Sequence, residues 1–251
     1  MSKAFYYKTE YVEAIRLQNH VKPYPPHNHV SVCAVGVVLR GEMALWRQRG
    51  TSMLGAGMVF AILPYETHAL TPRGPVDMVS LCIPADLVWG AANAKLMNAV
   101  NTLFPLLHDR GMLEKNQASL FLYGINELLR MRNEQLSIRC PYVAEIRDLI
   151  ERQPDETLRV ERLAKAANLC KDHLIRLFKR EVGLTPHKFQ MQNRVRMAQR
   201  LIGQGVSIAK VAQATGFYDQ SHLDKQFRFV MGISPIEYKK ALSADSSKAP
   251  A

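Results

Sequence analysis

A repeated unit near the carboxyl end is the feature that most limits how this chain of 251 residues can fold. The segment 169–189, LCKDHLIRLFKREVGLTPHKF, is followed at 217–238 by FYDQSHLDKQFRFVMGISPIEY, which has the same pattern. Leu174, Phe178, Gly183 and Pro186 of the first copy have counterparts of the same residue type in the second, namely Leu223, Phe227, Gly232 and Pro235. Because a whole unit recurs, the sequence predicts two similar helical units.

Each copy has the pattern of a helix-turn-helix. A short helix, at 160–167 or 208–214, leads to a tight turn at Asn168 or Gly216, residue types that tolerate a left-handed backbone. The next helix is apolar on one face and polar on the other, which leaves the polar face free for a partner. In DNA-binding units of this kind, the first turns of that helix face base edges in the major groove. The residues expected to contact bases are Asp172, Ile175 and Arg176 in the first unit and Gln220, Ser221, His222 and Lys225 in the second.

The charge of the chain favours DNA over a merely solvated helix face. Lys and Arg number 33 against 22 Asp and Glu, a formal net charge of +11, and most of the excess follows residue 136. A basic excess in the same segment as the repeat points to an anionic partner, and double-stranded DNA is the first expectation. The residues expected to contact DNA phosphates are Lys171, Lys179, Arg180, Lys188, Arg194 and Arg228.

The rest of the chain has a different character, so the sequence predicts an α+β protein of two domains. Residues 1–84 contain short β-rich runs such as SVCAVGVVL, typical of a barrel, and 85–136 contains two helix-length stretches, 85–104 and 114–133. These stretches are expected to pack on the barrel or on a second subunit. The helical repeats occupy 137–242, and 243–251 is expected to be a flexible tail. The sequence lacks membrane-length apolar runs, an apolar leader and clustered cysteines, which predicts a cytoplasmic protein with reduced thiols.

The segment 207–238 resembles the second helix-turn-helix of the AraC/XylS transcription regulators. Its matching pattern is S-x-A-x-V-A-x-x-x-G-F-x-D-Q-S-H-L-x-x-x-F-x-x-x-x-G-x-S-P-x-x-Y. The resemblance extends back to about Ser137 and implies a seven-helix domain in which a long helix, 186–202, joins the two units. It also implies that two recognition helices enter successive major grooves, and that the protein regulates transcription, usually as an activator in contact with RNA polymerase. Cys170 departs from the family, which usually has a helix-capping Ser there.

Residues 20–83 resemble the cupin-type barrel that many members of this family carry as a sensor. The similar residues are the H-x-H of 27–29, Gly41-Glu42, and Gly57, Pro64, Glu66 and His68 in the pattern G-x-x-x-x-x-x-P-x-E-x-H. The resemblance implies a small-molecule effector of unknown identity and a homodimer. The residues expected to line a ligand pocket are His27, His29, Trp46 and His68, although packing in the core is the simpler expectation for Trp46.

The three histidines fall where metal-binding cupins have imidazole ligands, but the usual carboxylate after the second His is missing. We therefore expect neither a metal nor another cofactor, and the alternative is zinc held by His27, His29, Cys33 and His68. The sequence contains no Gly-rich phosphate loop, no G-x-S-x-G and no H-E-x-x-H, so no catalytic residues are predicted and an enzyme is not expected. Two alternatives remain open: a metal-dependent cupin enzyme with an accessory DNA-binding module, and a constitutive DNA-binding protein whose barrel no longer binds a ligand.

Overall fold

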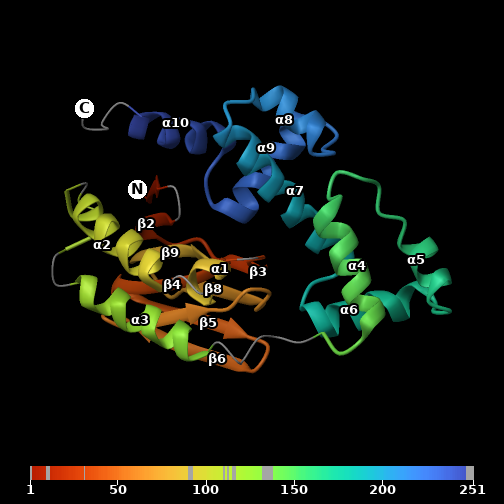
Figure 1. The fold of residues 1–251 in the computed structure, drawn as a ribbon, viewed down its shortest axis with the longest axis horizontal. Helices are drawn as coiled ribbons and strands as arrows, with labels where there is room; N and C mark the ends of the chain where they lie inside the picture. The colour runs from red at the N-terminus through yellow and green to blue at the C-terminus, as the bar shows by residue number, and fades with distance from the viewer. Residues whose placement is uncertain are drawn as a thin grey trace. The chain divides into compact units, whose positions relative to one another are not determined.

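The structure is a computed structural model that describes residues 2–9, 12–30, 32–89, 93–109, 111, 113–114, 117–131 and 138–246. It contains two compact units, Met1–Leu136 and Ser137–Ala251 (Figure 1). The domain boundary predicted at 136/137 and residues 247–251 of the predicted tail lie outside the described residues. The start of that tail is helical, because the last helix continues to Ser246.

Two antiparallel sheets form the first unit (Figure 1). The five-stranded sheet has the order β1 (Lys3–Lys8), β2 (Glu13–His20), β9 (Val76–Pro84), β4 (Val32–Arg40) and β7 (Val59–Ile62). The four-stranded sheet has the order β3 (Tyr24–His27), β8 (His68–Pro72), β5 (Glu42–Arg47) and β6 (Gly50–Gly55). Residues of both sheets, among them Ala34, Val38, Leu45 and Leu70, share one apolar cluster, which confirms the barrel.

Strand β4 explains why the chain here is an almost unbroken apolar run. Ala34 and Val38 belong to the cluster shared by the two sheets, whereas Cys33, Val35 and Val37 belong to a second cluster with the helices of this unit. A strand that is buried on both faces loses the alternation of apolar and polar residues. The β4 run therefore marks the layer between the barrel interior and the helices.

Three helices pack on the five-stranded sheet: α1 (Ala85–Trp89), α2 (Asn93–Asp109) and α3 (Ala118–Arg130) (Figure 1). The helix predicted at 85–104 corresponds to α1 and α2, with residues 90–92 outside the described residues, and α2 continues past the predicted end to Asp109. The second predicted helix, at 114–133, corresponds to α3. Gly124 allows α3 to lie close to β4, because a Cβ atom at this position would be 2.4 Å from a methyl carbon of Val35.

Seven helices occupy residues 138–246 of the second unit: α4 (Pro141–Arg152), α5 (Val160–Ala166), α6 (Lys171–Val182), α7 (Pro186–Gly203), α8 (Ile208–Ala214), α9 (Gln220–Met231) and α10 (Pro235–Ser246). The helix pairs α5–α6 and α8–α9 are the two predicted helix-turn-helix units, and α7 joins them. Asn168 and Gly216 have φ of 54° and 71°, so both turns have the left-handed backbone that the sequence predicted. No helix among the described residues has the length and apolar character needed to cross a membrane.

Aromatic side chains fix each recognition helix to a neighbour. The rings of Phe178 on α6 and Phe189 on α7 have centroids 5.8 Å apart, and those of Phe227 on α9 and Tyr238 on α10 are 5.6 Å apart. All four side chains are fully buried. Burial of one such side chain stabilises the fold by roughly 1.5–3 kcal/mol. The apolar faces of α6 and α9 are therefore firmly held, which leaves their polar faces outward.

Candidate nucleic-acid interface and barrel sites

The first recognition helix, α6, exposes the residues expected to read bases. Asp172 and Arg176 are exposed and Ile175 is half-buried, whereas Leu174 and Phe178 on the opposite face are fully buried. The helix begins at Cys170, whose side chain makes no capping hydrogen bond. This end of the helix therefore lacks the stabilisation that a capping Ser provides.

The second recognition helix, α9, is capped and exposes a similar polar surface. The Asp219 carboxylate accepts a hydrogen bond of 2.7 Å from the His222 backbone N–H. Gln220, Ser221 and Lys225 are exposed. His222 is half-buried, and its ring meets the ring of Phe217 edge-on with centroids 5.3 Å apart. His222 thus also packs on the turn that precedes the helix.

Tyr218 is a candidate DNA contact that the sequence analysis missed. It comes directly before the capping residue Asp219, and its side chain is 93% exposed. An aromatic residue at the start of a recognition helix, beside polar residues expected to read bases, was the signal available in the sequence. An exposed phenol can donate a hydrogen bond to a phosphate oxygen while its ring contacts the sugar.

Most of the basic residues predicted to contact phosphates are exposed on the second unit. Lys179 and Lys188 are exposed, and three others are exposed with acidic neighbours nearby. The nitrogen–oxygen distances are 2.6 Å from Lys171 to Glu161, 3.5 Å from Arg180 to Glu181 and 2.8 Å from Arg228 to Asp224. The Lys171 and Arg228 pairs are exposed, and pairs of this kind contribute only about 0–1 kcal/mol, so phosphates can replace these partners. Arg180 is exposed, although its neighbour Glu181 is mostly buried.

Arg194 is the exception, because its guanidinium is engaged by groups of the protein itself, and its role in phosphate binding stays a prediction. Its Nε donates to the Pro154 carbonyl at 2.7 Å, and its Nη2 donates to the Asp155 and Glu156 carbonyls, each at 3.1 Å. Its Nη1 donates to the Gly216 carbonyl. All three guanidinium nitrogens are thus used inside the protein. The residue joins helix α7 to the α4–α5 loop and to the turn of the second helix-turn-helix.

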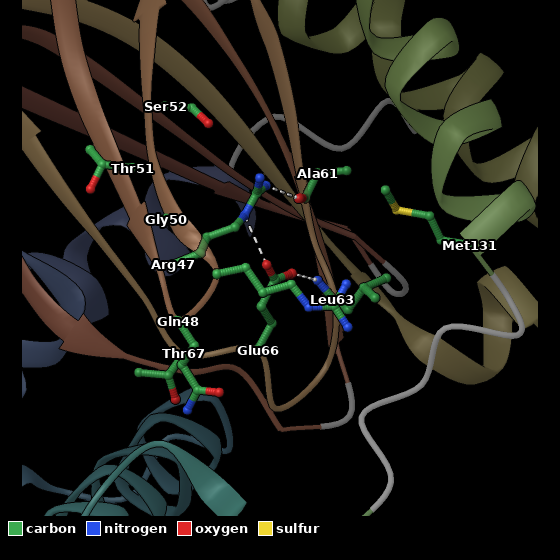
Figure 2. Close-up of a pocket in the computed structure, with 11 residues that line it drawn as sticks. Arg47, Gln48, Gly50, Thr51, Ser52, Ala61, Leu63, Glu66, Thr67 and Met131 are labelled. Atoms are coloured by element: carbon green, nitrogen blue, oxygen red, sulfur yellow. Dashed lines mark hydrogen bonds and ion pairs between the residues drawn. The ribbon is translucent and has the colours of Figure 1, made fainter. Parts of the chain in front are cut away.

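A pocket of about 360 Å³ lies at one end of the barrel (Figure 2). The Arg47 guanidinium lies 2.8 Å from a Glu66 carboxylate oxygen and donates to the Ala61 carbonyl at 2.7 Å. The second Glu66 oxygen accepts from the Leu63 N–H at 3.0 Å. The lining combines polar and apolar surface and consists of Arg47, Gln48, Arg49, Gly50, Thr51, Ser52, Ala61, Leu63, Glu66, Thr67 and Met131.

None of the four residues expected to line a ligand pocket belongs to this lining. Trp46 is 40% exposed, and it alternates along β5 with Met43 and Leu45, which are buried in the barrel cluster. Because side chains alternate across a strand, Trp46 points away from the barrel interior. The expectations that it packs in the core or lines a barrel pocket are therefore both wrong.

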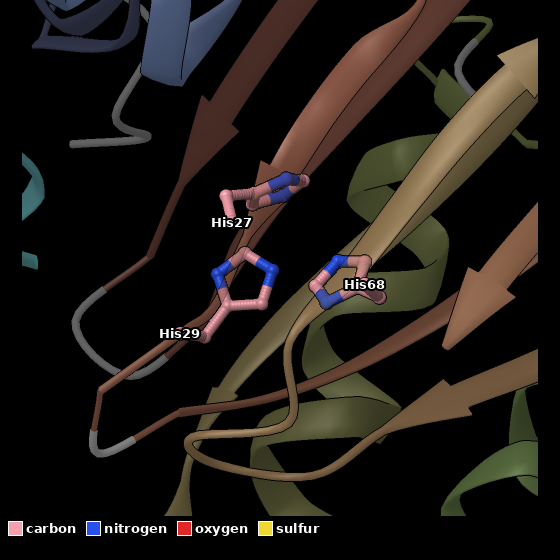
Figure 3. A group of neighbouring side chains, drawn as sticks. All are labelled: His27, His29 and His68. Carbon is pink, nitrogen blue, oxygen red and sulfur yellow. The ribbon is translucent and has the colours of Figure 1, made fainter. Parts of the chain in front are cut away.

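The three predicted histidines do lie together (Figure 3). The ring centroids of His27 and His68 are 4.3 Å apart. The His29 centroid lies 5.3 Å from that of His27 and 5.1 Å from that of His68. One nitrogen from each ring lies within 4.8 Å of the others. Burial, and then the neighbouring His27, lowers the pKa of His68 to about 3, so this imidazole is neutral at physiological pH.

Cys33 does not belong to this group. Its side chain is fully buried in the cluster between β4 and the helices, not in the barrel interior. Burial raises the pKa of the Cys33 thiol to about 12, which disfavours the thiolate that zinc would need. The zinc alternative that included Cys33 is therefore wrong as to this ligand.

Comparison with known proteins agrees with this architecture. Residues 10–122 match the family model of the AraC-like ligand binding domain, and residues 163–241 match that of a helix-turn-helix domain. The transcriptional regulator YbfI of Bacillus subtilis is 24% identical over 239 residues, which are 85% of this chain and 86% of that protein. The probable transcriptional regulator LumQ of Photobacterium leiognathi is 33% identical over 95 residues, or 38% of each chain.

A solved structure shares the two-domain fold. The crystal structure of ToxT from Vibrio cholerae has a TM-score of 0.55 at 14% sequence identity, and the match covers 92% of this chain and 97% of that one. The ligand-binding and helix-turn-helix family models together with the YbfI relative confirm the recognition made from the sequence. The chain belongs to the AraC family of transcriptional regulators, with a ligand-binding barrel domain followed by a helix-turn-helix DNA-binding domain.

Proposed function

We propose that this DNA-binding transcription regulator inserts α6 and α9 into two successive major grooves on one face of a duplex. The observation that carries the proposal is the shared design of the two helices. Each buries one apolar face, at Leu174 and Phe178 or at Leu223 and Phe227, and exposes polar residues in its first turns. Successive grooves on one face of B-DNA are about 34 Å apart, so one chain would read an asymmetric site with two sub-sites.

Arg176 and Gln220 are the side chains best suited to discriminate between bases. Both are exposed in the first turns of their helices. An arginine can donate two hydrogen bonds to guanine, and a glutamine amide matches the donor and acceptor of adenine; each such pair contributes about 1–3 kcal/mol of discrimination. The other proposed base contacts are Asp172, Ile175, Ser221, His222 and Lys225.

Phosphate contacts would supply most of the affinity and make it depend on salt. We assign this role to exposed basic residues around the recognition helices, which are Lys171, Lys179, Arg180, Lys188 and Arg228. Tyr218 adds a neutral contact at the start of α9. Arg194 supports the arrangement from inside, because its hydrogen bonds connect α7 with the α4–α5 loop and with the turn of the second helix-turn-helix.

The barrel domain would bind a small effector and thereby favour one state of the regulator over another. The pocket lined by parts of β5, β6 and β7 supports a small ligand with polar groups, since Gln48, Arg49, Thr51 and Ser52 offer several hydrogen-bonding groups beside apolar surface. We further propose a homodimer in the cytoplasm that activates transcription in contact with RNA polymerase. The regulator names of the relatives support a regulatory and not a catalytic role.

The decisive experiment selects bound sequences from a pool of randomised duplexes, with the wild type, Arg176→Ala and Gln220→Ala in parallel. We expect the wild type to select two sub-sites one helical turn apart, and each variant to lose preference at one sub-site only. The matched control for loss of one positive charge is Arg152→Ala. Arg152 is an exposed residue on α4, outside both helix-turn-helices. A selected site that occupies a single groove, or unchanged preferences in both variants, would overturn the proposal.

A further inference from the structure

Three imidazoles meet in the barrel because the backbone brings them there. His27 at the end of β3 is the antiparallel partner of His68 at the start of β8. His29 follows β3, and its carbonyl accepts a hydrogen bond of 2.6 Å from the Tyr65 N–H, which holds it next to the segment that leads into β8. Two strands and one loop thus place the rings side by side (Figure 3).

Hydrogen bonds define which nitrogen of two rings carries the proton. The Nδ1 atom of His27 lies 2.8 Å from the Pro25 carbonyl oxygen, and the Nδ1 atom of His68 lies 2.9 Å from that of Glu66. A carbonyl oxygen can only accept, so in the neutral rings Nδ1 bears the proton and Nε2 keeps its lone pair. This is the arrangement in which a metal-binding histidine donates its other N–H to a backbone carbonyl.

The surroundings restrict the donor set to neutral nitrogens. The Glu66 carboxylate is held by Arg47 and by the Leu63 N–H, and Cys33 lies among the residues packed against the helices. His68 is 2% exposed and His27 is 9% exposed, so water has little access to these two rings. Imidazole nitrogens suit zinc and other late transition metals, whereas magnesium and calcium require oxygen ligands.

We propose that His27, His29 and His68 bind one divalent transition-metal ion in the barrel, with zinc as the probe, and that Cys33 is not a ligand. Zinc binds imidazole nitrogen at about 2.0–2.1 Å, so two ligand nitrogens around it are at most about 4 Å apart. The nitrogens here lie within 4.8 Å, so small side-chain rotations would complete the site. The fourth position of a tetrahedral ion remains for water or an anion. This inference does not depend on how the second unit meets DNA.

The test titrates zinc into the full-length protein after treatment with a chelator, and compares the wild type with His29→Ala. His29 is only half-buried and follows the strand, so its removal should leave the barrel folded. We expect one zinc per chain in the wild type, and an affinity loss in the variant at least as large as the 10- to 100-fold typical for loss of an outer hydrogen-bond partner. His187→Ala, an exposed histidine on α7, is the matched control and should bind like the wild type.

A second measurement keeps the result clear if a variant is unstable. Zinc should raise the unfolding midpoint of the barrel in the wild type and in His187→Ala, but not in His29→Ala, because a ligand that binds only the folded state stabilises it. Both tryptophans of the chain, Trp46 and Trp89, lie in the first unit, so their fluorescence reports on the barrel. Equal stabilisation of wild type and His29→Ala, or no zinc binding by the wild type, would overturn the proposal.

Cobalt(II) then identifies the donor atoms. Three nitrogens should give visible d–d absorption without an intense thiolate-to-cobalt charge-transfer band in the near ultraviolet. The appearance of that band, and its loss in Cys33→Ser, would overturn the three-imidazole donor set. Magnesium in excess should not displace the cobalt.

Discussion

The two helix-turn-helix units have the same backbone geometry but reach it with different residues. The first turn uses Asn168 and the second uses Gly216, both with positive φ. The first recognition helix begins at Cys170 without a side-chain cap, whereas the second begins at Asp219, whose carboxylate caps the helix. The same fold is therefore specified twice, with stronger local signals in the second copy.

Tertiary contacts separate the two turns further. A Cβ atom on Gly216 would lie 2.5 Å from the Asp155 carbonyl oxygen and 3.0 Å from the Arg194 guanidinium carbon. The second turn is thus pressed against the α4–α5 loop, and its glycine serves both its own conformation and the packing of the domain. We expect substitutions in the second turn to cost more than the equivalent ones in the first.

The largest effect is expected from Gly216→Ala. A left-handed backbone costs an alanine about 1–2 kcal/mol. The close contact with Asp155 adds about 1–3 kcal/mol of the kind caused by overpacking. Asn168→Ala, the equivalent change in the first helix-turn-helix, should cost only the free energy of placing an alanine in the left-handed backbone. Chemical denaturation followed by far-ultraviolet circular dichroism measures both; equal losses would show that the two turns do not differ in packing.

Arg194→Ala should come next, with a loss of about 1.5–3 kcal/mol, the range for hydrogen bonds to a charged group. Arg194→Lys should not restore it, because a lysine cannot reach four carbonyls with one ammonium group. Tryptophan fluorescence should remain at wild-type values, since both tryptophans belong to the barrel domain, Met1–Leu136. If DNA affinity falls while stability is unchanged, Arg194 acts on phosphates after all.

Asp219→Ala should cost about 1 kcal/mol, because it removes the hydrogen bond to the His222 N–H. Cys170→Ala, at the equivalent position of the first helix-turn-helix, should be nearly neutral, since the Cys170 side chain makes no capping hydrogen bond. The pair isolates the contribution of the cap. A similar loss in both variants would mean that packing, and not capping, determines the effect.

The smallest effect is expected from Cys170→Ser, with a gain of about 0.5–1 kcal/mol. A serine hydroxyl can accept from the exposed N–H groups at the start of α6, as Asp219 does for α9. The same denaturation experiment measures the gain, with Cys170→Ala, which removes the thiol without adding a hydroxyl, as the matched control. A stability at or below that of the wild type would show that the geometry at Cys170 does not permit capping.

Local patterns explain why much of the second unit could be predicted. Leu174 and Phe178, with Leu223 and Phe227 after them, recur at helical spacing, and Asn168 and Gly216 mark turns through conformational preferences of single residues. Such signals act over a few residues and are visible in the sequence. The barrel was recognised from the H-x-H of 27–29 and its companions, but the end of α2 at Asp109 was not predicted, because tertiary packing decides where an apolar helix ends.

The sequence by itself determined the family, the two helical repeats and the residue types that face outward from α6 and α9. Only the tertiary structure decided that Arg194 is used by four carbonyls, that Trp46 points outward, and that Cys33 lies apart from the three histidines. Each of these depends on partners distant in the chain, or on which face of a strand meets the core. A basic or thiol side chain has the same character in every sequence, and its role depends on the groups that the fold brings within hydrogen-bonding distance.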